Sequence, residues 1–402
     1  MTLTEGSVTP SHGSLCEGRQ RRVHQMIENV GGYWRPYAGV LRLLEELGEL
    51  SDELQRCPDG ASDTSGVAEE MADLWIISTC TANQFNIALP PVRDSCPANP
   101  GRESHLNFAE LVTQAGGIAR TINYYDGPKT PRTFKEWSPL RKLIPAFQSA
   151  LCNLADDYAI ELGSTIDTKI AKALHRDSGR FTRGHDPSSA DVLEDFAAVR
   201  RDSPCRFAKG ARLWGAPKWT TSESVSGNAA GIAPYMTVFA KAAPYEQLDG
   251  FIVAITDTSI AQRMVNLSAC FARILAELAS RDPVYGDTLS GHILRKGWQF
   301  SFTGLRMFIS VFSPLYPGNH PRYSPDTTFI LFQPEQSFAD HAIGSGSRAT
   351  DCLKEMIRSD FQKAGKPYLG DLVDRRIEAH LYILPRWPGD PEVSWWQQLQ
   401  RR

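Results

Sequence analysis

The sequence lacks the features that mark several common classes of protein. Its 402 residues contain no apolar run near the roughly 18 residues that a membrane-spanning helix needs. Basic residues are not in excess, because 43 Lys and Arg stand against 46 Asp and Glu, which disfavours a dedicated nucleic-acid binder. The eight cysteines form no CxxC pair, which argues against a zinc ribbon, a disulfide framework and covalent c-type haem. We therefore expect a reduced, cytoplasmic protein that binds neither nucleic acid nor a membrane.

Common nucleotide and hydrolase motifs are absent as well. The sequence contains no GxGxxG, GxxxxGK[ST], GxSxG or HExxH. These absences remove the support for a Rossmann cofactor site, a P-loop, a hydrolase nucleophile elbow and a zincin. Any chemistry must therefore come from another arrangement of side chains.

The composition changes along the chain and divides it into two domains. Residues 1–22 have no apolar signal core and are predicted to be a disordered tail. Residues 23–200 have helical periodicity and predict an all-α helical bundle. Residues 201–400 mix short β-rich runs with helices, which predicts an α+β domain with a central, mostly antiparallel sheet. The fold class is therefore multidomain.

Particular elements follow from the same patterns. In the first half, Leu43, Leu47, Leu50 and Leu54 form one helical stripe, and a second stripe begins at Val67. The Gly/Ser-rich stretch 220–231 is either a linker or a long loop. Strands are expected at 248–255, 298–302, 307–312, 328–332 and 381–384.

Carboxylates accompany both apolar stripes of the first half. In LLEELGELSDEL, Glu46 and Glu49 are three residues apart, and in AEEMADLW the same spacing separates Glu70 from Asp73. Each pair therefore shares a helix face beside residues that must point inward. If the two helices pack antiparallel, four carboxylates meet at the rim of the shared core.

Such a cluster is costly unless a cation neutralises it. Two carboxylates about 5 Å apart repel by roughly 3 kcal/mol at an effective dielectric near 20. Mg²⁺ or Mn²⁺ would resolve the repulsion, since both prefer oxygen ligands and leave positions for water and substrate phosphates. The chemistry this favours is metal-assisted attack of water on a phosphoanhydride. The alternative is an acidic helix face that is simply solvated.

The two acidic helices carry a resemblance to a known family. YWRPYAGVLRLLEELGELSDEL followed by EEMADLW resembles the EExxE…ExxD signature of the MazG-like all-α nucleoside triphosphate pyrophosphohydrolases, over about residues 25–190. The resemblance implies cleavage of an NTP or dNTP to the monophosphate and pyrophosphate, and a dimer formed through the helical domain. It also implies that Glu45 supports the site or positions water. The Mg²⁺ ligands it implies are Glu46, Glu49, Glu70 and Asp73.

A triphosphate needs cations besides the metal. Lys169, Lys172 and Arg176 follow i, i+3, i+7 spacing in DTKIAKALHRDSGR and so share one helical face, and Arg180 follows in the next turn-rich stretch. These residues are the candidate phosphate ligands. The alternative is an ordinary basic surface at the end of a helix, where the dipole favours positive charge.

The second half contains one candidate cofactor site. The run KGWQFSFTGLRMFISVFSPLYPGNHPRYSPDTTFILFQPEQSF places His320 and Arg322 in a loop between aromatic strands. Haem would use an imidazole for its iron, a guanidinium for a propionate and aromatic walls. The alternative is a loop histidine in a Pro/Gly turn. His292, His341 and His380 are further candidates, and His380 is expected on a buried strand.

This half also resembles a known family. The pattern W-x-F-x-F-x-G…F-x-P…H-x-R…F-Q-P-x-x-x-F, with SPCRFAKGA before it and LPRWPGDPE after it, resembles the YqcI/YcgG family over about residues 204–396. Some members of that family are haem-dependent oxygenases that hydroxylate nitrogen of an amino or guanidino substrate. The resemblance would make His320 the axial ligand and Arg322 its polar neighbour.

Three hypotheses from different classes follow. The first, which we favour, is a Mg²⁺-dependent nucleoside triphosphate pyrophosphohydrolase. The second is a haem-dependent N-oxygenase in the C-terminal domain, either as a second activity or with the helical domain ancillary. The third is a non-catalytic nucleotide sensor. The sequence does not indicate which base or sugar is preferred.

Overall fold

The computed structural model describes residues 18–57, 63–92, 104–130, 137–176, 184–284, 288–341, 348–366 and 377–400. The chain forms two compact units, Met1–Ser188 and Ser189–Arg402, and each is described here by itself. Within these described ranges, no helix has both the length and the apolar character that crossing a bilayer requires.

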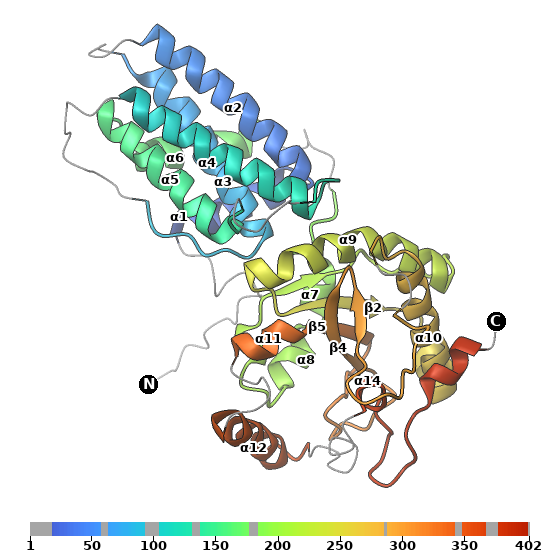
Figure 1. Cartoon of the computed structure of the whole chain (residues 1–402). Coiled ribbons are helices and arrows are strands. Elements are labelled where there is room, and N and C mark those ends of the chain that lie inside the picture. The colour runs from blue at the N-terminus through green and yellow to red at the C-terminus, as the bar shows by residue number, and fades with distance from the viewer. Residues whose placement is uncertain are drawn as a thin grey trace, which may run out of the picture. The chain divides into compact units, whose positions relative to one another are not determined.

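The first unit is built of helices packed side by side (Figure 1). The N-terminal helix begins at residue 18, so residues 18–22 are helical and do not belong to the predicted disordered tail, whose remainder lies outside the described residues. The helices are α1 (Gly18–Val30), α2 (Pro36–Arg56), α3 (Ser65–Gln84), α4 (Ser104–Tyr125), α5 (Leu140–Asp157) and α6 (Leu162–Arg176).

Helices α2 and α3 pack through the stripes that the sequence indicates. Leu43, Leu47 and Leu50 of α2 are buried, and so are Val67 and Met71 of α3. Burying each such side chain contributes about 1.5–3 kcal/mol relative to leaving it exposed. This packing fixes the rotation of both helices, and therefore the direction of the carboxylates next to each stripe.

Buried polar side chains tie further helices to α3. The amide of Gln148 on α5 donates to the hydroxyls of Ser78 and Thr79, at 3.1 and 3.0 Å. Gln20 on α1 donates to Asn83 at 2.9 Å. Because a buried polar group without a partner is costly, these bonds hold α1 and α5 in one register against α3.

The second unit has a five-stranded sheet in the order β1-β2-β5-β4-β3. The expected mostly antiparallel sheet is wrong, because the sheet is mixed: β1 pairs in parallel with β2, whereas the other neighbours are antiparallel. The short strand β1 was absent from the sequence prediction. The strands are β1 (Leu213–Gly215), β2 (Gly250–Ile255), β3 (Phe300–Phe302), β4 (Leu305–Phe312) and β5 (Thr328–Pro334).

Helices cover both faces of this sheet (Figure 1). On one face, α7 (Asp191–Asp195) and α8 (Ala197–Asp202) bury Leu193 and Phe196 against Ile252 and Phe329. On the other, Phe239 of α9 (Val225–Glu246) lies with its ring centroid 5.4 Å from that of Phe251. Burial on both faces explains why β2 is one uninterrupted apolar run.

The packing of α7 and α8 moves the domain boundary. We expected residues 189–200 to complete the helical bundle, with the second domain starting at 201. The compact units instead divide between Ser188 and Ser189, because the apolar side chains of α7 and α8 belong to the core beneath the sheet.

Two further expectations are corrected. The Gly/Ser-rich stretch is neither linker nor long loop after residue 224, because α9 begins at Val225, with the Ser224 hydroxyl accepting from the amide of Gly227 at 3.0 Å. The strand expected at 381–384 is wrong, since its first two residues end helix α14 (Ala379–Tyr382) and the other two lie in no strand. Its burial comes from aromatic packing: the Tyr382 ring stacks on Trp395 with centroids 6.1 Å apart.

The remaining elements of the second unit are helices. They are η3 (Ala208–Gly210), η4 (Ile260–Gln262), α10 (Met264–Ser280), α11 (Glu335–Asp340), α12 (Arg348–Lys363) and η5 (Trp395–Gln400).

Candidate metal and phosphate site

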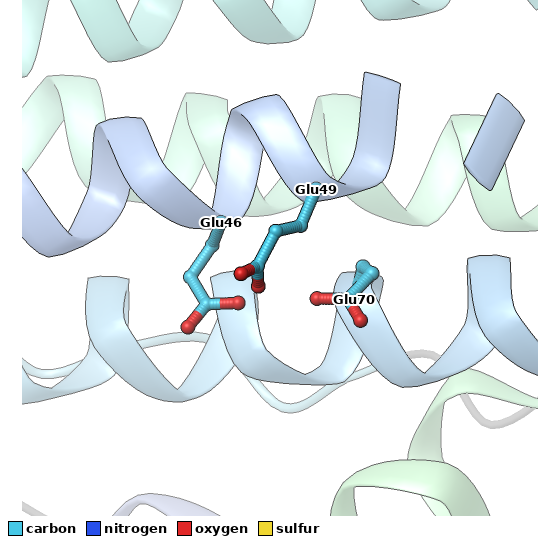
Figure 2. A group of neighbouring side chains, drawn as sticks. All are labelled: Glu46, Glu49 and Glu70. Atoms are coloured by element: carbon cyan, nitrogen blue, oxygen red, sulfur yellow. The ribbon is translucent and has the colours of Figure 1, made fainter. Parts of the chain in front are cut away.

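Three carboxylates of the first unit converge between α2 and α3. Glu46 and Glu49 point from α2 toward α3, where Glu70 meets them (Figure 2). Carboxylate oxygens from the three residues all lie within 4.8 Å of one another. Each residue is placed by the apolar stripe beside it, so the helix packing itself assembles the cluster.

Glu46 is the most enclosed of the three. Its residue is 1% exposed, and Arg42 on the same helix forms an ion pair with one of its carboxylate oxygens. Burial, followed by the charge of Asp73, raises the pKa of Glu46 to about 8. Burial also raises the pKa of Glu70 above its ordinary value. Both carboxyl groups therefore hold their protons to a higher pH than an exposed glutamate does.

Asp73 lies beside this group but has a cation of its own. Its carboxylate accepts a hydrogen bond from Nζ of Lys169 on α6 at 2.6 Å. Burial by itself would lower the pKa of Lys169, but the pair with Asp73 outweighs it and the pKa is raised. Of the four ligands that the sequence predicts, three form the close group and the fourth faces Lys169.

Arg42 supplies a second positive charge at the cluster. Its guanidinium forms an ion pair with Glu46 one turn later on α2, and another with Glu45 at 2.5 Å. The Glu45 side chain is 55% exposed and is not part of the close group of three carboxylates. Its predicted role in supporting the site or positioning water is not tested by this arrangement.

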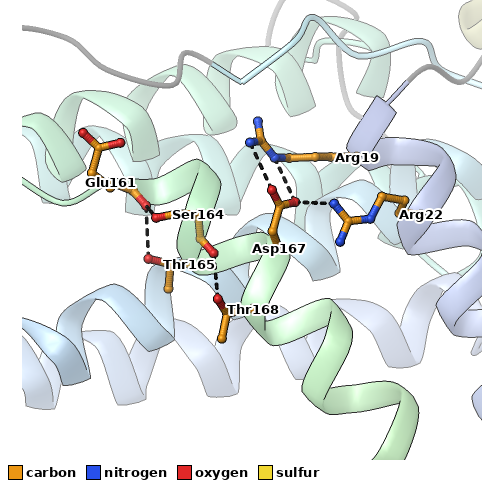
Figure 3. Close-up of polar contacts among 7 residues, drawn as sticks. All are labelled: Arg19, Arg22, Glu161, Ser164, Thr165, Asp167 and Thr168. Atoms are coloured by element: carbon orange, nitrogen blue, oxygen red, sulfur yellow. Dashed lines mark hydrogen bonds and ion pairs between the residues drawn. The ribbon is translucent and has the colours of Figure 1, made fainter.

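Helix α6 is anchored so that its lysines face α3. Asp167 accepts from Arg19 at 3.0 Å and from Arg22 at 2.7 Å, both on α1 (Figure 3). Two residues further along α6, Lys169 reaches Asp73, and Lys172 lies 3.5 Å from Glu69. The predicted phosphate ligands Lys169 and Lys172 are thus brought to the acidic cluster. The side chain of Arg176 and all of Arg180 lie outside the described residues.

A cavity of about 520 Å³ opens next to the charged groups. Arg42, Glu46, Asp73 and Lys169 line it, and so does Trp34. Much of the remaining lining is apolar and comes from α1 and α3. Periodicity could place Arg42 on the acidic face of α2, but the cavity depends on how helices α1, α2, α3 and α6 meet. The other lining residues of α1 and α3 include Met26, Ile27, Val30, Ile76, Ile77, Cys80, Thr81 and Gln84.

The donor set fits a hard divalent cation. Three carboxylates within one ion's reach are the ligands that Mg²⁺ and Mn²⁺ prefer. Glu46 is buried beside Glu49, Glu70 and Asp73, and its pKa is raised by burial and by the charge of Asp73, so a cation bound among these carboxylates would offset their repulsion. The residues present therefore fit the predicted metal.

The residues at the predicted haem site do not fit an iron ligand. His320 is 5% exposed and stacks on Tyr316, with ring centroids 4.2 Å apart. Its Nδ1 accepts from the amide of Arg322 at 3.0 Å, and its Nε2 lies 3.2 Å from the carbonyl of Pro385. A carbonyl only accepts, so Nε2 carries the proton and neither nitrogen offers iron a free lone pair.

The electrostatics of His320 agree with a neutral ring. Burial, and then the charge of Arg322, lower the pKa of His320 to about 4. The Arg322 guanidinium itself lies over the Phe312 ring at 5.1 Å, in a cation–π contact. Of the other candidates, His341 lies 2.9 Å from Asp249, and His380, on a helix rather than a strand, stacks on Trp396.

Comparison with known protein families identifies a domain in the C-terminal part of the chain. Residues 193–391 match the model of the YqcI/YcgG family, so the C-terminal part of the chain carries a YqcI/YcgG family domain. The family match begins inside α7, close to where the second compact unit starts.

A curated relative is similar to a short part of the chain. The uncharacterized protein YpjD of Bacillus subtilis (strain 168) is 34% identical over 68 residues, which is 16% of this chain and 61% of YpjD. The chain thus spans less than two thirds of that relative. No solved structure matches the chain significantly.

Proposed function

We propose that the first unit is a Mg²⁺-dependent nucleoside triphosphate pyrophosphohydrolase, which cleaves an NTP or dNTP to the monophosphate and pyrophosphate. The observation that carries the proposal is the convergence of Glu46, Glu49 and Glu70 within 4.8 Å, because Glu46 also lines a cavity that three cationic side chains line. The resemblance of the two acidic helices to the MazG-like enzymes supports the same reaction.

The distribution of charge around the cavity suits a polyphosphate. Lys169 and Lys172 on α6 and Arg42 on α2 line the cavity that the carboxylates border. Phosphate oxygens need such cations as well as the metal, since each anhydride segment carries negative charge. Carboxylates alone would repel a triphosphate, so both signs of charge are needed at one site.

The rest of the cavity suits a substrate with a flat, less polar end. Ile76 and Ile77 line it on α3, and Trp34 adds an aromatic surface. Pockets that bind small molecules are mostly apolar with a few placed polar groups, and volumes of 300–1,000 Å³ are typical. A volume of about 520 Å³ is consistent with a nucleotide.

The proposed roles follow from these positions. Glu46, Glu49 and Glu70, joined by Asp73, would hold Mg²⁺, which when bound neutralises phosphate charge and makes a water molecule more acidic. Lys169 and Lys172 would bind phosphate oxygens and orient the chain of anhydrides. The enclosed position of Glu46 would keep bulk water from competing for the same charges.

The experiment is pyrophosphate release by the full chain with Mg²⁺ and a panel of NTPs and dNTPs. Glu46→Gln keeps the shape and removes the charge, and we expect it to lower the rate by more than about 100-fold, beyond what a group outside the ligand set costs. Asp52→Asn, an exposed carboxylate on the same helix, is the matched control and should retain the rate.

Two other results are informative. Equal rates for the unaltered chain and Glu46→Gln would remove the proposal. Nucleotide binding without turnover in the unaltered chain would replace it with a nucleotide sensor.

A further inference from the structure

Lys169 is held in place by ion pairs of its side chain with α3 and by the attachment of its own helix to α1. Its side chain is 13% exposed, and Nζ lies 2.6 Å from Asp73 and 3.6 Å from Glu69, both on α3. The helix that carries it is fixed to α1 two residues earlier, where Asp167 pairs with Arg19 and Arg22 (Figure 3). The lysine therefore cannot leave Asp73 by a rigid shift of α6 without breaking that anchor.

The carboxylate of Asp73 therefore lies between two possible partners, which are Lys169 and a cation bound by the three-carboxylate group. The spacing on α3 puts it one turn beyond Glu70, beside the three-carboxylate group, and its charge is felt there, because it is the largest charge raising the pKa of Glu46. One oxygen of its carboxylate nevertheless already accepts a hydrogen bond from the Lys169 ammonium. A carboxylate cannot give the same oxygen to a lysine and to a small dication at full strength, because the two cations repel.

We propose that Lys169 is an internal counter-ion for Asp73, which Asp73 exchanges for the divalent cation when the metal site fills. This inference rests on the proposed metal site and adds a regulation of it: Lys169 sets how tightly the site takes up metal. The exchange frees the ammonium at the place where the proposed function needs a phosphate ligand. Metal uptake and anion uptake are then linked through one side chain.

The exchange predicts that losing the lysine strengthens metal binding. Lys169→Met keeps the aliphatic stem and removes the charge. In calorimetric titrations of the full chain with Mg²⁺ alone, we expect its Kd to be about tenfold lower than that of the unaltered chain, within the usual range of coupling between sites. A merely structural lysine would do the opposite, because a disordered site binds metal more weakly.

Through-space repulsion must be separated from competition for Asp73. Lys172→Met removes the same charge from the same helix without touching Asp73, and it should lower the Kd by less than about threefold. In an Asp73→Asn background, Lys169→Met should then change the Kd no more than Lys172→Met does. This double-mutant cycle isolates the pair.

The outcomes distinguish this inference from the proposed function. If the unaltered chain takes up Mg²⁺ and Lys169→Met binds it equally or more weakly, the exchange is overturned and the metal site stands. An undiminished effect of Lys169→Met in the Asp73→Asn background also overturns it. If the unaltered chain takes up no Mg²⁺ at millimolar concentration, both fail. Lys169→Gln, a second neutral variant, serves if Lys169→Met does not fold, as judged by circular dichroism.

Discussion

Glu46 forms an ion pair with Arg42, one turn earlier on α2, while its own residue is almost fully shielded from solvent. The pairing does not compensate for burial and for neighbouring negative charge, because the pKa of Glu46 still rises to about 8. A carboxyl that is protonated near neutral pH in the metal-free chain must lose its proton to bind a cation. Protonation and metal uptake are therefore coupled at this residue.

The stability of the metal-free chain should depend on pH through Glu46. The folded pKa of about 8 lies above the ordinary value of 4.5, so the folded state binds the extra proton between these values. The contribution of this group to stability is therefore complete below pH 4.5 and is lost as the pH rises through about 8. This contribution can be measured by thermal unfolding of the unaltered chain and of Glu46→Gln from pH 5 to 9, following the transition in which the first unit unfolds.

We expect the melting temperature of the unaltered chain to fall relative to that of Glu46→Gln across this range. Saturating Mg²⁺ should reverse the difference at high pH, because the metal binds only the folded, deprotonated site. Parallel curves for the two chains would show that Glu46 ionises normally.

Close backbone packing in the second unit gives a test of its core. A Cβ at Gly215 on β1 would meet Cγ1 of Val192 at 2.3 Å and Cβ of Ala190 at 2.8 Å. Gly215→Ala should therefore destabilise this unit by about 1–3 kcal/mol, the usual cost of overpacking. Gly231→Ala is the control, since a Cβ there meets nothing within 4 Å and lies inside α9. It should be neutral or stabilising by up to about 1 kcal/mol. Urea unfolding of both variants decides, and equal stability of the two would contradict the packing of α7 on β1.

The hydrogen bonds of His320 predict a colourless protein. Because both ring nitrogens have partners, chain purified from haem-supplied cells should show no Soret band that depends on His320. His320→Ala should instead lower stability by about 1–3 kcal/mol, since it removes the hydrogen bonds that the buried ring makes with the Pro385 carbonyl and the Arg322 amide. A Soret band that His320→Ala abolishes would refute this assignment and restore the haem site.

We also propose that the chain dimerises through the helical unit, as the resemblance implies. Tyr37, Leu41 and Leu44 form an exposed stripe on α2 at i, i+4 and i+7, and the two leucines are 62% and 65% exposed. Leu44→Glu should shift the mass measured by light scattering from dimer to monomer. Leu106→Glu, an equally apolar exposed site on α4, should leave the mass unchanged. A monomeric unaltered chain would rule out this interface.

The sequence was most informative where side-chain spacing alone determines the result. The stripe of Leu43, Leu47 and Leu50 and the carboxylates next to it have one helical period, so the packing of α2 on α3 and the convergence of three carboxylates could be predicted. The strands β2 and β5 were similarly visible, because burial on both faces makes them continuous apolar runs.

Features that depend on distant contacts could not be predicted. The ion pair of Asp73 with Lys169 joins residues 96 positions apart, and nothing in the spacing selects this partner. Helix α9 begins in SVSGNAAG, whose composition favours a loop, and it forms because a Ser224 cap and buried residues such as Ile232 outweigh propensity. The prediction of a strand at 381–384 was wrong because a short apolar run does not distinguish a strand from a buried helix.

The central claim is that facing carboxylates of α2 and α3 support hydrolysis at the α-phosphorus of a nucleoside triphosphate. The most direct measurement is ³¹P NMR of the products formed by the full chain with Mg²⁺ in ¹⁸O-labelled water. We predict nucleoside monophosphate and pyrophosphate, with the label in the monophosphate, and no reaction with Glu46→Gln. Release of inorganic phosphate and a diphosphate, label in the pyrophosphate, or unchanged triphosphate would contradict the account.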